Sequence, residues 1–260
     1  MQIATWNING IKARLPEVEY WLKEYKPEIV CLQEIKSIDE NFPREVFEDL
    51  GYNVETHGQK SFNGVAILSL LPFEEVNRGL PGDDADEQAR FIEGVFNGEN
   101  GAPFRVAGIY LPNGNPVDTP KFPYKLGWMD RLIDWTAERL KLEEPLIVAG
   151  DYNIIPESID THSHDDWWGD ALYREESLER FRALQALGMT DGLRAANNEQ
   201  AYTFWDFQAG AWRRNNGIRI DHLMCSAQAT DMLESVEVHK DMRGREKPSD
   251  HVPVVGNFSF

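Results

Sequence analysis

The stretch Gly150-Asp151-Tyr152-Asn153-Ile154-Ile155-Pro156 sets the architecture, because it directly follows the apolar run Pro145-Leu146-Ile147-Val148-Ala149. A short apolar run bounded by Pro and Gly is typical of a strand buried on both faces of a sheet. Side chains alternate along an extended chain, so Asp151 and Asn153 are expected on the same side where a central strand ends. Open α/β sheets place their chemistry outside strand ends. An acid and an amide there could orient a water molecule and hold a phosphate oxygen.

The same heptapeptide has a plainer interpretation as an Asx turn that closes the strand. Asp, Asn and Gly dominate turns, so this segment alone leaves both interpretations open. Other segments of the sequence are needed to distinguish a structural turn from a functional site.

Working outward from this strand, the sequence predicts alternating strands and helices. Residues 2–6 and 28–33 are expected to be strands with a helix over 15–25 between them, which is a crossover unit of a layered α/β sheet. Further strands are expected at 52–57, 64–70, 91–96, 104–110, 146–149, 221–226, 234–239 and 252–260, helices at about 121–142 and 174–187, and a polar loop at 82–87. No linker or low-complexity tract divides the chain. We therefore expect one domain over residues 1–260, built of two similar α/β halves with a boundary at about 115–145. The fold class would be a four-layer α/β sandwich, with two packed mixed β-sheets flanked by helices.

The composition suits such a domain, since 42% of the 260 residues are hydrophobic. Cys31 and Cys225 each lie in an apolar run, which favours buried free thiols in a reducing compartment over a disulfide. The N-terminus has no basic region followed by a long apolar stretch, and nothing is long enough to span a bilayer. We expect a cytoplasmic monomer with no membrane partner.

The formal charge of −18 argues by itself against a polyanionic partner. Its distribution weakens that argument, because the acids gather in 157–180 whereas 119–129 and 207–220 contain none. The sequence therefore predicts a basic face, with the acidic helices pointing away from it. The residues expected on this face are Lys36, Lys121, Lys125, Arg213 and Arg214.

Polar clusters close the predicted strands or enter loops beside them. They are Asn7 with Asn9, Glu34, Tyr110 to Asn113, Asp151 with Asn153, and Arg219-Ile220-Asp221 with Ser249-Asp250-His251. Each cluster alone is weak evidence of a functional site, since a single strand-terminal acid is usually solvated and a lone His is usually not catalytic.

Together these clusters lie in motifs that closely resemble those of the exonuclease III group, the AP endonucleases of the endonuclease/exonuclease/phosphatase superfamily. The motifs are Trp6-Asn7-Ile8-Asn9-Gly10, Leu32-Gln33-Glu34-Ile35-Lys36, Gly150-Asp151-Tyr152-Asn153, Arg219-Ile220-Asp221 and Pro248-Ser249-Asp250-His251-Val252-Pro253. The resemblance covers essentially all 260 residues, with the motifs in the family's order.

The resemblance implies a catalytic set and a metal site. Asp151 would position or deprotonate the attacking water, held by Asn153. His251 would donate to the scissile phosphate, oriented by Asp221, and Tyr110 would lend its hydroxyl to the same phosphate. One or two Mg²⁺ or Mn²⁺ ions would bind beside them, because hard cations take oxygen ligands. The implied metal-site residues are Glu34, Asn7, Asp250 and Asp151.

The resemblance also implies contacts to duplex DNA. DNA-binding residues would be Asn9, Lys36, Asn113, Lys121, Arg213, Arg214 and Arg219. The pocket or wedge for an abasic sugar would be formed by Phe204, Trp205, Trp212 and Ile218. Plain core packing is the alternative for Phe204 and Trp205, whereas Trp212 lies in a polar loop and is expected to stack or wedge near DNA.

The implied function is Mg²⁺-dependent hydrolysis 5′ to abasic sites, giving 3′-hydroxyl ends, with 3′→5′ exonuclease activity and trimming of blocked 3′ ends. One alternative is a small-molecule phosphodiesterase or phosphatase of the same superfamily, and another is a catalytically silent scaffold. The loop His162-Ser163-His164-Asp165-Asp166 could bind Zn²⁺, but composition alone favours a solvated loop.

Overall fold

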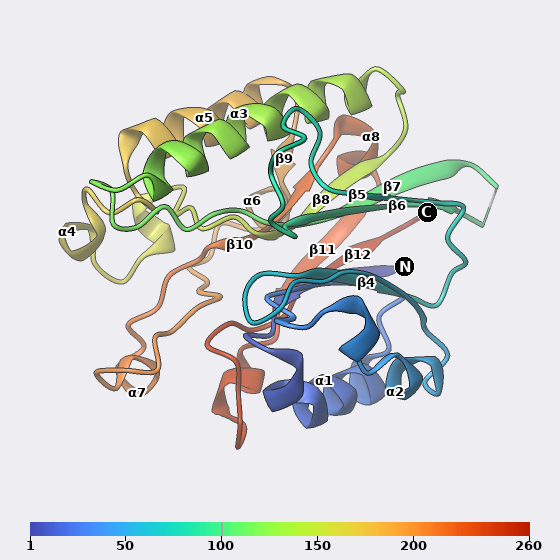
Figure 1. The fold of residues 1–260 in the computed structure, drawn as a ribbon. Coiled ribbons are helices and arrows are strands. Elements are labelled where there is room, and N and C mark those ends of the chain that lie inside the picture. The colour runs from blue at the N-terminus through green and yellow to red at the C-terminus, as the bar shows by residue number, and fades with distance from the viewer. Residues whose placement is uncertain (100) are drawn as a thin grey trace.

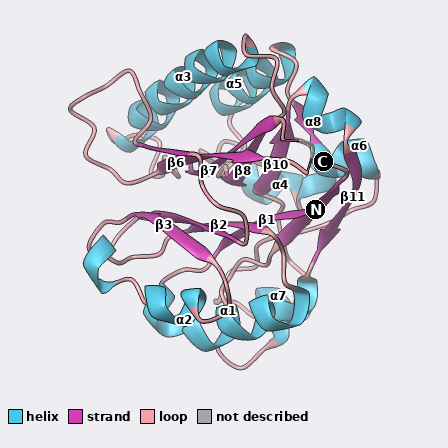
Figure 2. Cartoon of the chain, turned by 90° about the vertical axis from the view of Figure 1, so that its right-hand side faces the viewer, coloured by secondary structure: helices cyan, strands magenta, loops and turns pink. Residues whose placement is uncertain are grey.

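Two six-stranded sheets pack against each other in the computed structural model, which describes residues 1–99 and 101–260. Figure 2 shows the sheets as the two inner layers, with α3 and α5 on one outer side and α1 and α2 on the other. The predicted four-layer α/β sandwich is therefore confirmed.

The first sheet has the order β11-β12-β1-β2-β4-β3, and its central pair β1 and β2 is parallel. Its other pairs are antiparallel. The strands are β1 (Gln2–Asn7), β2 (Ile29–Gln33), β3 (Asn53–His57), β4 (Val65–Ser69), β11 (Leu233–Val238) and β12 (Val254–Phe258).

The second sheet has the order β5-β6-β7-β8-β10-β9, and its parallel pair is β7 with β8. Its other pairs are also antiparallel. The strands are β5 (Glu75–Arg78), β6 (Phe91–Asn97), β7 (Pro103–Tyr110), β8 (Leu146–Asp151), β9 (Thr190–Asp191) and β10 (Asp221–Cys225).

Two long helices connect the parallel pairs, α1 between β1 and β2 and α3 between β7 and β8. In Figure 1, α3 and α5 lie over the second sheet, and α1 and α2 lie under the first. The α-helices are α1 (Ile11–Tyr25), α2 (Arg44–Glu48), α3 (Lys121–Leu140), α4 (His164–Trp167), α5 (Glu175–Ala186), α6 (Gly192–Ala196), α7 (Ala211–Arg214) and α8 (Ala227–Asp231). Short 3-10 helices cover Asp39–Asn41, Ser158–Asp160 and Lys240–Gly244.

Each sheet thus repeats one arrangement, a parallel pair joined by a helix and flanked by antiparallel strands. On this basis we propose that the chain is one domain of two similar halves. The chain returns to the first sheet at its end, so the Phe258 N–H donates to the Met1 carbonyl (2.8 Å) and the two termini lie close together (Figure 1).

Most predicted elements are present, and the differences have physical reasons. The sequence missed β5 because Glu75-Val76-Asn77-Arg78 is a mostly polar edge strand without apolar alternation. The first helix begins at Ile11 rather than at residue 15, with Pro16 inside it. Both cysteines are free and buried, as expected. Among the described residues, every helix is too short or too polar to span a lipid bilayer.

Strand β8 is buried along its whole length, as its apolar sequence predicts. At Gly150 a Cβ atom would lie 2.0 Å from the Ile109 carbonyl oxygen, so only glycine allows β7 and β8 to approach this closely. This close packing fixes the strand end at which Asp151 stands.

Candidate active site

A cavity of about 320 Å³ opens at the carboxyl ends of the central strands. Asn7 ends β1, Glu34 follows β2, Tyr110 ends β7 and Asp151 ends β8, while Asp221 begins the antiparallel β10. Because the carboxyl ends of β1, β2, β7 and β8 lie at one edge of the sandwich, residues from distant motifs meet there. The polar lining consists of Glu34, Tyr110, Asn113, Asn115, Asp151, Asn153, Asp170, Asp206, Asp250 and His251.

One amide joins the carboxylates of the two sheets. The Nδ2 of Asn7 donates to Glu34 Oε1 (3.0 Å) and to Asp151 Oδ2 (2.9 Å). The Asn7 Oδ1 accepts from the Asn9 N–H (3.0 Å). Asn7 was predicted among the metal-site residues, but its oxygen is engaged and its NH₂ faces the carboxylates. Its NH₂ group links the two acids, and its place among the metal-site residues stays a prediction.

Glu34 stands at φ +50°, a left-handed conformation that is uncommon for a Glu and is typical of functional sites. Its carboxylate also accepts from the Tyr110 hydroxyl (2.9 Å) and pairs with Lys36 Nζ (2.8 Å). Burial raises the pKa of Glu34, but Lys36 and Asn7 outweigh it and leave the pKa below its usual value. Glu34 is therefore ionised at neutral pH. The pKa of the Tyr110 hydroxyl is raised well above 10 by burial and by Glu34, so it stays a donor.

His251 lies between two buried aspartates. Its Nδ1 faces Asp221 (2.9 Å to Oδ2), so we assign the Nδ1 proton to that hydrogen bond, and its Nε2 lies 3.8 Å from Asp151 Oδ2. Burial lowers the pKa of His251, but Asp221 and Asp151 raise it to about 10. Burial also raises the pKa of Asp151, with Asp221 adding to the rise and His251 and Asn7 opposing it. A charged imidazolium thus faces a buried carboxyl group whose basicity is increased.

Asp151 and Asn153 form a turn and line the cavity, so the two interpretations of this segment are compatible. The Asn153 N–H donates to Asp151 Oδ1 (2.9 Å), and Asn153 has φ +48°, which Asn tolerates better than most residues. The expectation that the side chain of Asn153 holds Asp151 needs correction. That side chain donates to the Leu111 carbonyl (2.9 Å) and accepts from Asn113 (3.0 Å), and only its backbone N–H reaches Asp151.

Asn9, Lys36 and Asp250 form a polar group beside Glu34. The Asn9 Nδ2 donates to Asp250 Oδ1 (3.0 Å), and Lys36 Nζ donates to Asn9 Oδ1 (2.5 Å). Asp250 is half-buried, lines the cavity and contributes to the raised pKa of His251.

The donor set fits a metal ion. Asp151, Asp221 and His251 have potential ligand atoms within 4.8 Å of one another. The charged imidazolium has no free lone pair, so the carboxylates are the groups that suit a cation here. Glu34 adds an ionised carboxylate that Asn7 ties to Asp151. In the described parts of the chain, no comparable group forms in the 162–166 loop, where His164 instead stacks on Trp168 at 5.2 Å between ring centroids.

Two predicted DNA-face cations lie inside the protein. Arg219 is 1% exposed and pairs with Asp160 (Nε to Oδ1, 2.7 Å) and Asp191 (2.8 Å), so it cannot reach DNA. Lys125 is also fully buried. Arg213 and Arg214 are exposed on α7, as expected. The acid-rich segment does not simply point away from the site, because Asp170 lines the cavity.

The predicted abasic pocket also needs correction. Trp205 is fully buried in the core beside α1, and Ile218 is 1% exposed in the other core. Trp212 packs edge-on against Trp205 at 5.0 Å between ring centroids, so it does not project as a wedge. Phe204 does line the cavity and contacts the His251 ring edge-on at 5.0 Å.

Sequence reasoning missed several groups at or near the cavity. Trp167, Leu172 and Ile220 supply its apolar wall. Trp167 ends the short helix α4 and Leu172 lies in the loop after it, and this segment has no periodicity. The exposed aromatic near α7 is Phe207, which is 50% exposed. It borders a separate hollow of about 410 Å³ with Lys12, Ala13, Arg14, Pro16, Lys247 and Pro248.

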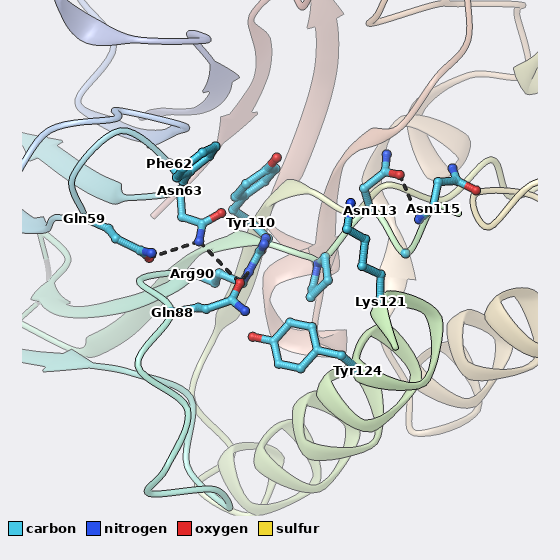
Figure 3. Close-up of a pocket in the computed structure, with 12 residues that line it drawn as sticks. Gln59, Phe62, Asn63, Gln88, Arg90, Tyr110, Asn113, Asn115, Lys121 and Tyr124 are labelled. Atoms are coloured by element: carbon cyan, nitrogen blue, oxygen red, sulfur yellow. Dashed lines mark hydrogen bonds between the residues drawn. The ribbon is translucent and has the colours of Figure 1, made fainter. Parts of the chain in front are cut away.

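A larger groove of about 560 Å³ adjoins the cavity and shares Tyr110, Asn113 and Asn115 with it. Figure 3 shows Gln59 and Phe62 on one side of this groove and Lys121 on the other. The Arg90 guanidinium lies over the Tyr110 ring, 4.7 Å from its centroid. Phe62 is 69% exposed at the rim. The site is thus a small acidic cavity that opens into a longer groove with cations and an exposed aromatic ring.

Comparison with known proteins gives one consistent family. The model of the Endonuclease/Exonuclease/phosphatase family matches residues 4–251. Exodeoxyribonuclease III of Haemophilus influenzae is 33% identical over 267 residues, which cover 99% of this chain and all of that protein. An exodeoxyribonuclease of Bacillus subtilis is 28% identical over 98% of both chains.

Solved structures agree over the full length. An AP endonuclease from Archaeoglobus fulgidus superposes with a TM-score of 0.94 at 36% identity, and a 3′-5′ exonuclease from Neisseria meningitidis with 0.95 at 34%, both covering 100% of each chain. A Neisseria structure described as a 3′ phosphatase bound to a product DNA hairpin gives the same values, 0.95 and 34%.

Proposed function

Because the chain belongs to the endonuclease/exonuclease/phosphatase family, within its exonuclease III group of phosphodiesterases, we propose that it cleaves duplex DNA on the 5′ side of abasic sites and leaves 3′-hydroxyl ends. Removal of blocking groups and nucleotides from 3′ ends is a second activity that we propose for the same site. The observation that carries the proposal is the buried Asp151–His251–Asp221 group, of which Asp151 and His251 line a cavity that adjoins a groove.

The roles follow from the geometry. Asp151 has the increased basicity that suits a group that takes a proton from water near neutral pH. The His251 Nε2 faces the cavity side of Asp151, and in its charged form it donates a hydrogen bond to a phosphate oxygen. Asp221 holds the opposite ring nitrogen and keeps the imidazolium charged. Asn113 and Asn153 border the space beside them with fixed amides.

We propose that Glu34 and Asp151 hold a Mg²⁺ or Mn²⁺ ion and that Asp250 is the candidate ligand where a second ion binds. Ionised carboxylates suit these hard cations. Such an ion would supply positive charge that polarises the phosphate oxygens. Asn7 would fix the spacing of the two acids with its two N–H donors.

The groove and the exposed side chains near α7 suit a duplex better than a small phosphoester. Lys121 and Arg90 line the groove, while Lys12, Arg14 and Lys247 surround Phe207 at the separate hollow. Cations at phosphates position DNA without reading its sequence. We further propose that the protein acts in the cytoplasm as a monomer, where its two free thiols stay reduced.

One assay tests the proposed function. A duplex with a single abasic analogue, an undamaged duplex and a duplex ending in a 3′-phosphate are each incubated with and without Mg²⁺. We expect Mg²⁺-dependent incision at the abasic analogue. Removal of the 3′-phosphate without incision would restrict the activity to 3′-end processing. Hydrolysis of inositol phosphates with all three duplexes intact would favour the small-molecule alternative, and no hydrolysis at all would favour the scaffold.

Replacing Arg213 and Arg214 together by Ala is expected to weaken binding of damaged and undamaged duplex alike. Both side chains are exposed on α7, and each lost phosphate contact should flatten the log–log salt dependence by about 0.9. Affinities measured at several salt concentrations check this. An unchanged slope would remove α7 from the DNA face.

Phe207→Ala is expected to cost more affinity on abasic duplex than on intact duplex, about 1–3 kcal/mol if the ring stacks on a base. Phe207 is half exposed. The guanidinium carbons of Arg14 and Arg243 lie 5.7 and 4.9 Å from the centroid of its ring. Trp212→Ala is the matched control, because that ring packs against Trp205. Equal losses for Phe207→Ala on both duplexes would show that the ring makes no contact that is specific to the abasic site.

A further inference from the structure

A lysine occupies a core position of α3. Lys125 is fully buried, and it lies on the same helix face as Phe122 and Met129, which are also buried. The helical spacing i, i+3 and i+4 puts these residues on one face. The sequence placed Lys125 on the DNA face because its neighbourhood lacks acids, but the helix turns its side chain into the protein.

The ammonium group of Lys125 donates to three backbone carbonyls. They belong to Asn153 (2.6 Å), Ala171 (3.0 Å) and Asn113 (3.2 Å). Burial lowers the pKa of Lys125 to about 7, with Asp170 and Asp151 opposing the shift. Only the charged form has three N–H donors and no acceptor, so three carbonyl partners indicate the ammonium, whose full capacity they use. The three carbonyls come from segments that are far apart in the chain, and each segment follows or precedes a different element.

All three segments line the candidate active site. Asn113, Asn153 and Leu172 border the cavity. Packing around the lysine stem is tight, since a Cβ on Gly114, which has φ +89°, would lie 2.7 Å from Lys125 Cδ. The segments are also linked to one another, because the Asn113 amide donates to Asn153 Oδ1 (3.0 Å).

Such an arrangement is a costly way to stabilise a fold. Burying an ammonium group requires giving up its hydration, and an apolar side chain of similar size in a core is often at least as stable. No carboxylate accepts directly from Lys125 within the described residues, so its partners are carbonyl dipoles that it holds at fixed positions.

We propose that Lys125 is a positioning residue of the active site, which ties the loops after β7 and β8 and the loop before α5 to a single point. The proposal rests on the proposed phosphodiesterase function. Only Asn153 separates Lys125 from Asp151. The Lys125 ammonium donates to the Asn153 carbonyl, and the N–H of Asn153 donates to Asp151 Oδ1 (2.9 Å). Loss of the tie would let Asn153, and with it the carboxylate of Asp151, move away from the phosphate.

The test compares Lys125→Met and Lys125→Arg with Leu132→Ala. Met keeps the unbranched stem, one atom shorter, without its donors. Arg keeps the charge but has a planar fork that cannot aim three donors at converging carbonyls. Leu132 is buried in α3 but outside the cavity, so Leu132→Ala controls for loss of helix packing. For each variant, kcat and KM on the abasic duplex and amide hydrogen exchange are measured below the unfolding temperature.

Both Lys125 variants should lose kcat by on the order of a hundredfold, the cost of small misplacement of reacting groups, with KM near the wild-type value. Their amide exchange should rise at Ala171, Ile155 and Asn115, whose N–H groups bond within or beside the tied loops. Leu132→Ala should lower the unfolding temperature with kcat retained.

Several outcomes would overturn the proposal. They are unchanged kcat in Lys125→Met, full rescue by Lys125→Arg, equal loss of kcat in Leu132→Ala, or failure of both Lys125 variants to fold while Leu132→Ala folds. If the wild-type protein does not cleave the duplex, the proposed function fails instead. Hydrogen exchange then still decides whether Lys125 ties the three loops.

Discussion

Glu34→Gln is expected to abolish metal-dependent cleavage while the fold is retained. Glu34 is ionised, and Asn7 fixes its distance from Asp151, so it is the carboxylate best placed to hold a divalent cation with that residue. Loss of several kcal/mol of charge stabilisation from a metal ion corresponds to a fall in kcat of about 10³-fold or more. Activity is measured on the abasic duplex over a range of Mg²⁺ concentrations.

The substitution also changes a quantity that does not depend on activity. An ion that binds only the folded protein at about 100 times its Kd adds about 2.7 kcal/mol to the free energy of unfolding. Mg²⁺ should therefore raise the melting temperature of the wild-type protein and have little effect on Glu34→Gln. Glu246→Gln, at an exposed position, controls for the lost negative charge. Ordinary Mg²⁺-dependent cleavage by Glu34→Gln would remove this residue from the metal site.

The partners of Glu34 indicate how stable the Glu34→Gln variant should be in the absence of metal. In the Gln variant, the amide oxygen can still accept from Asn7 and Tyr110, but the amide NH₂ would face Lys36. The Lys36–Glu34 pair is partly exposed, with side-chain exposures of 31% and 19%, so its loss should cost little stability. A large fall in the metal-free melting temperature would mean that the activity loss reports folding.

The sequence predicts the main features of the site because its motifs end strands that are clearly marked. The run before Asp151 is apolar along its whole length, and the repeated strand–helix–strand pattern requires parallel pairs whose carboxyl ends share an edge. The pattern therefore brings Asn7 to Glu34 and Tyr110 to Asp151 within each sheet, and the packing of the two sheets brings these pairs together although they lie far apart in the chain.

The direction of single side chains was harder to predict. An acid-free stretch indicates local charge but not which side of a helix faces the core, so Lys125 was placed on the wrong surface. Arg219 lies between Ile218 and Ile220, and alternation turns it away from these two residues. That opposite face is not exposed to solvent, because the buried Asp160 and Asp191 cover it. The local sequence gives no sign of these partners, which lie 59 and 28 residues away.

Loops explain the remaining differences. Trp167 and Leu172 reach the cavity from the segment between β8 and α5, where the sequence has no periodicity that would orient them. Trp212 was expected to project because its neighbours are Arg and Asn. Instead, the chain turns at Gly210 and Asn215, both in the left-handed region, and folds the indole onto Trp205. Polar neighbours in sequence therefore did not mean polar surroundings in space.

Asp221→Asn is expected to lower kcat by about 10²–10⁴-fold, the range that a positioned acid or base contributes. Asp221 holds His251 Nδ1 at 2.9 Å, and together with Asp151 it raises the pKa of the imidazole to about 10 against the effect of burial. Activity that needs the charged His251 is present below this pKa and is lost as the pH rises through it. An Asn at this position removes the negative charge, so the alkaline limb of the wild-type profile, near pH 10, should move to lower pH.

The acid limb provides the second readout. Asp221 also raises the pKa of Asp151, whose ionised form is the one that we propose takes the proton from water. Loss of the Asp221 charge therefore acts to lower the pKa of Asp151 and to extend activity toward acid. Weaker charging of His251 acts in the opposite direction, so the alkaline limb is the cleaner measurement. The limbs belong to the coupled group rather than to single residues. Rates on the abasic duplex from pH 5 to 10.5 at saturating Mg²⁺ test the shift, with Asp206→Asn, at the cavity rim, as the matched control. An alkaline limb that stays at the same pH in Asp221→Asn would show that His251 does not act as the charged donor.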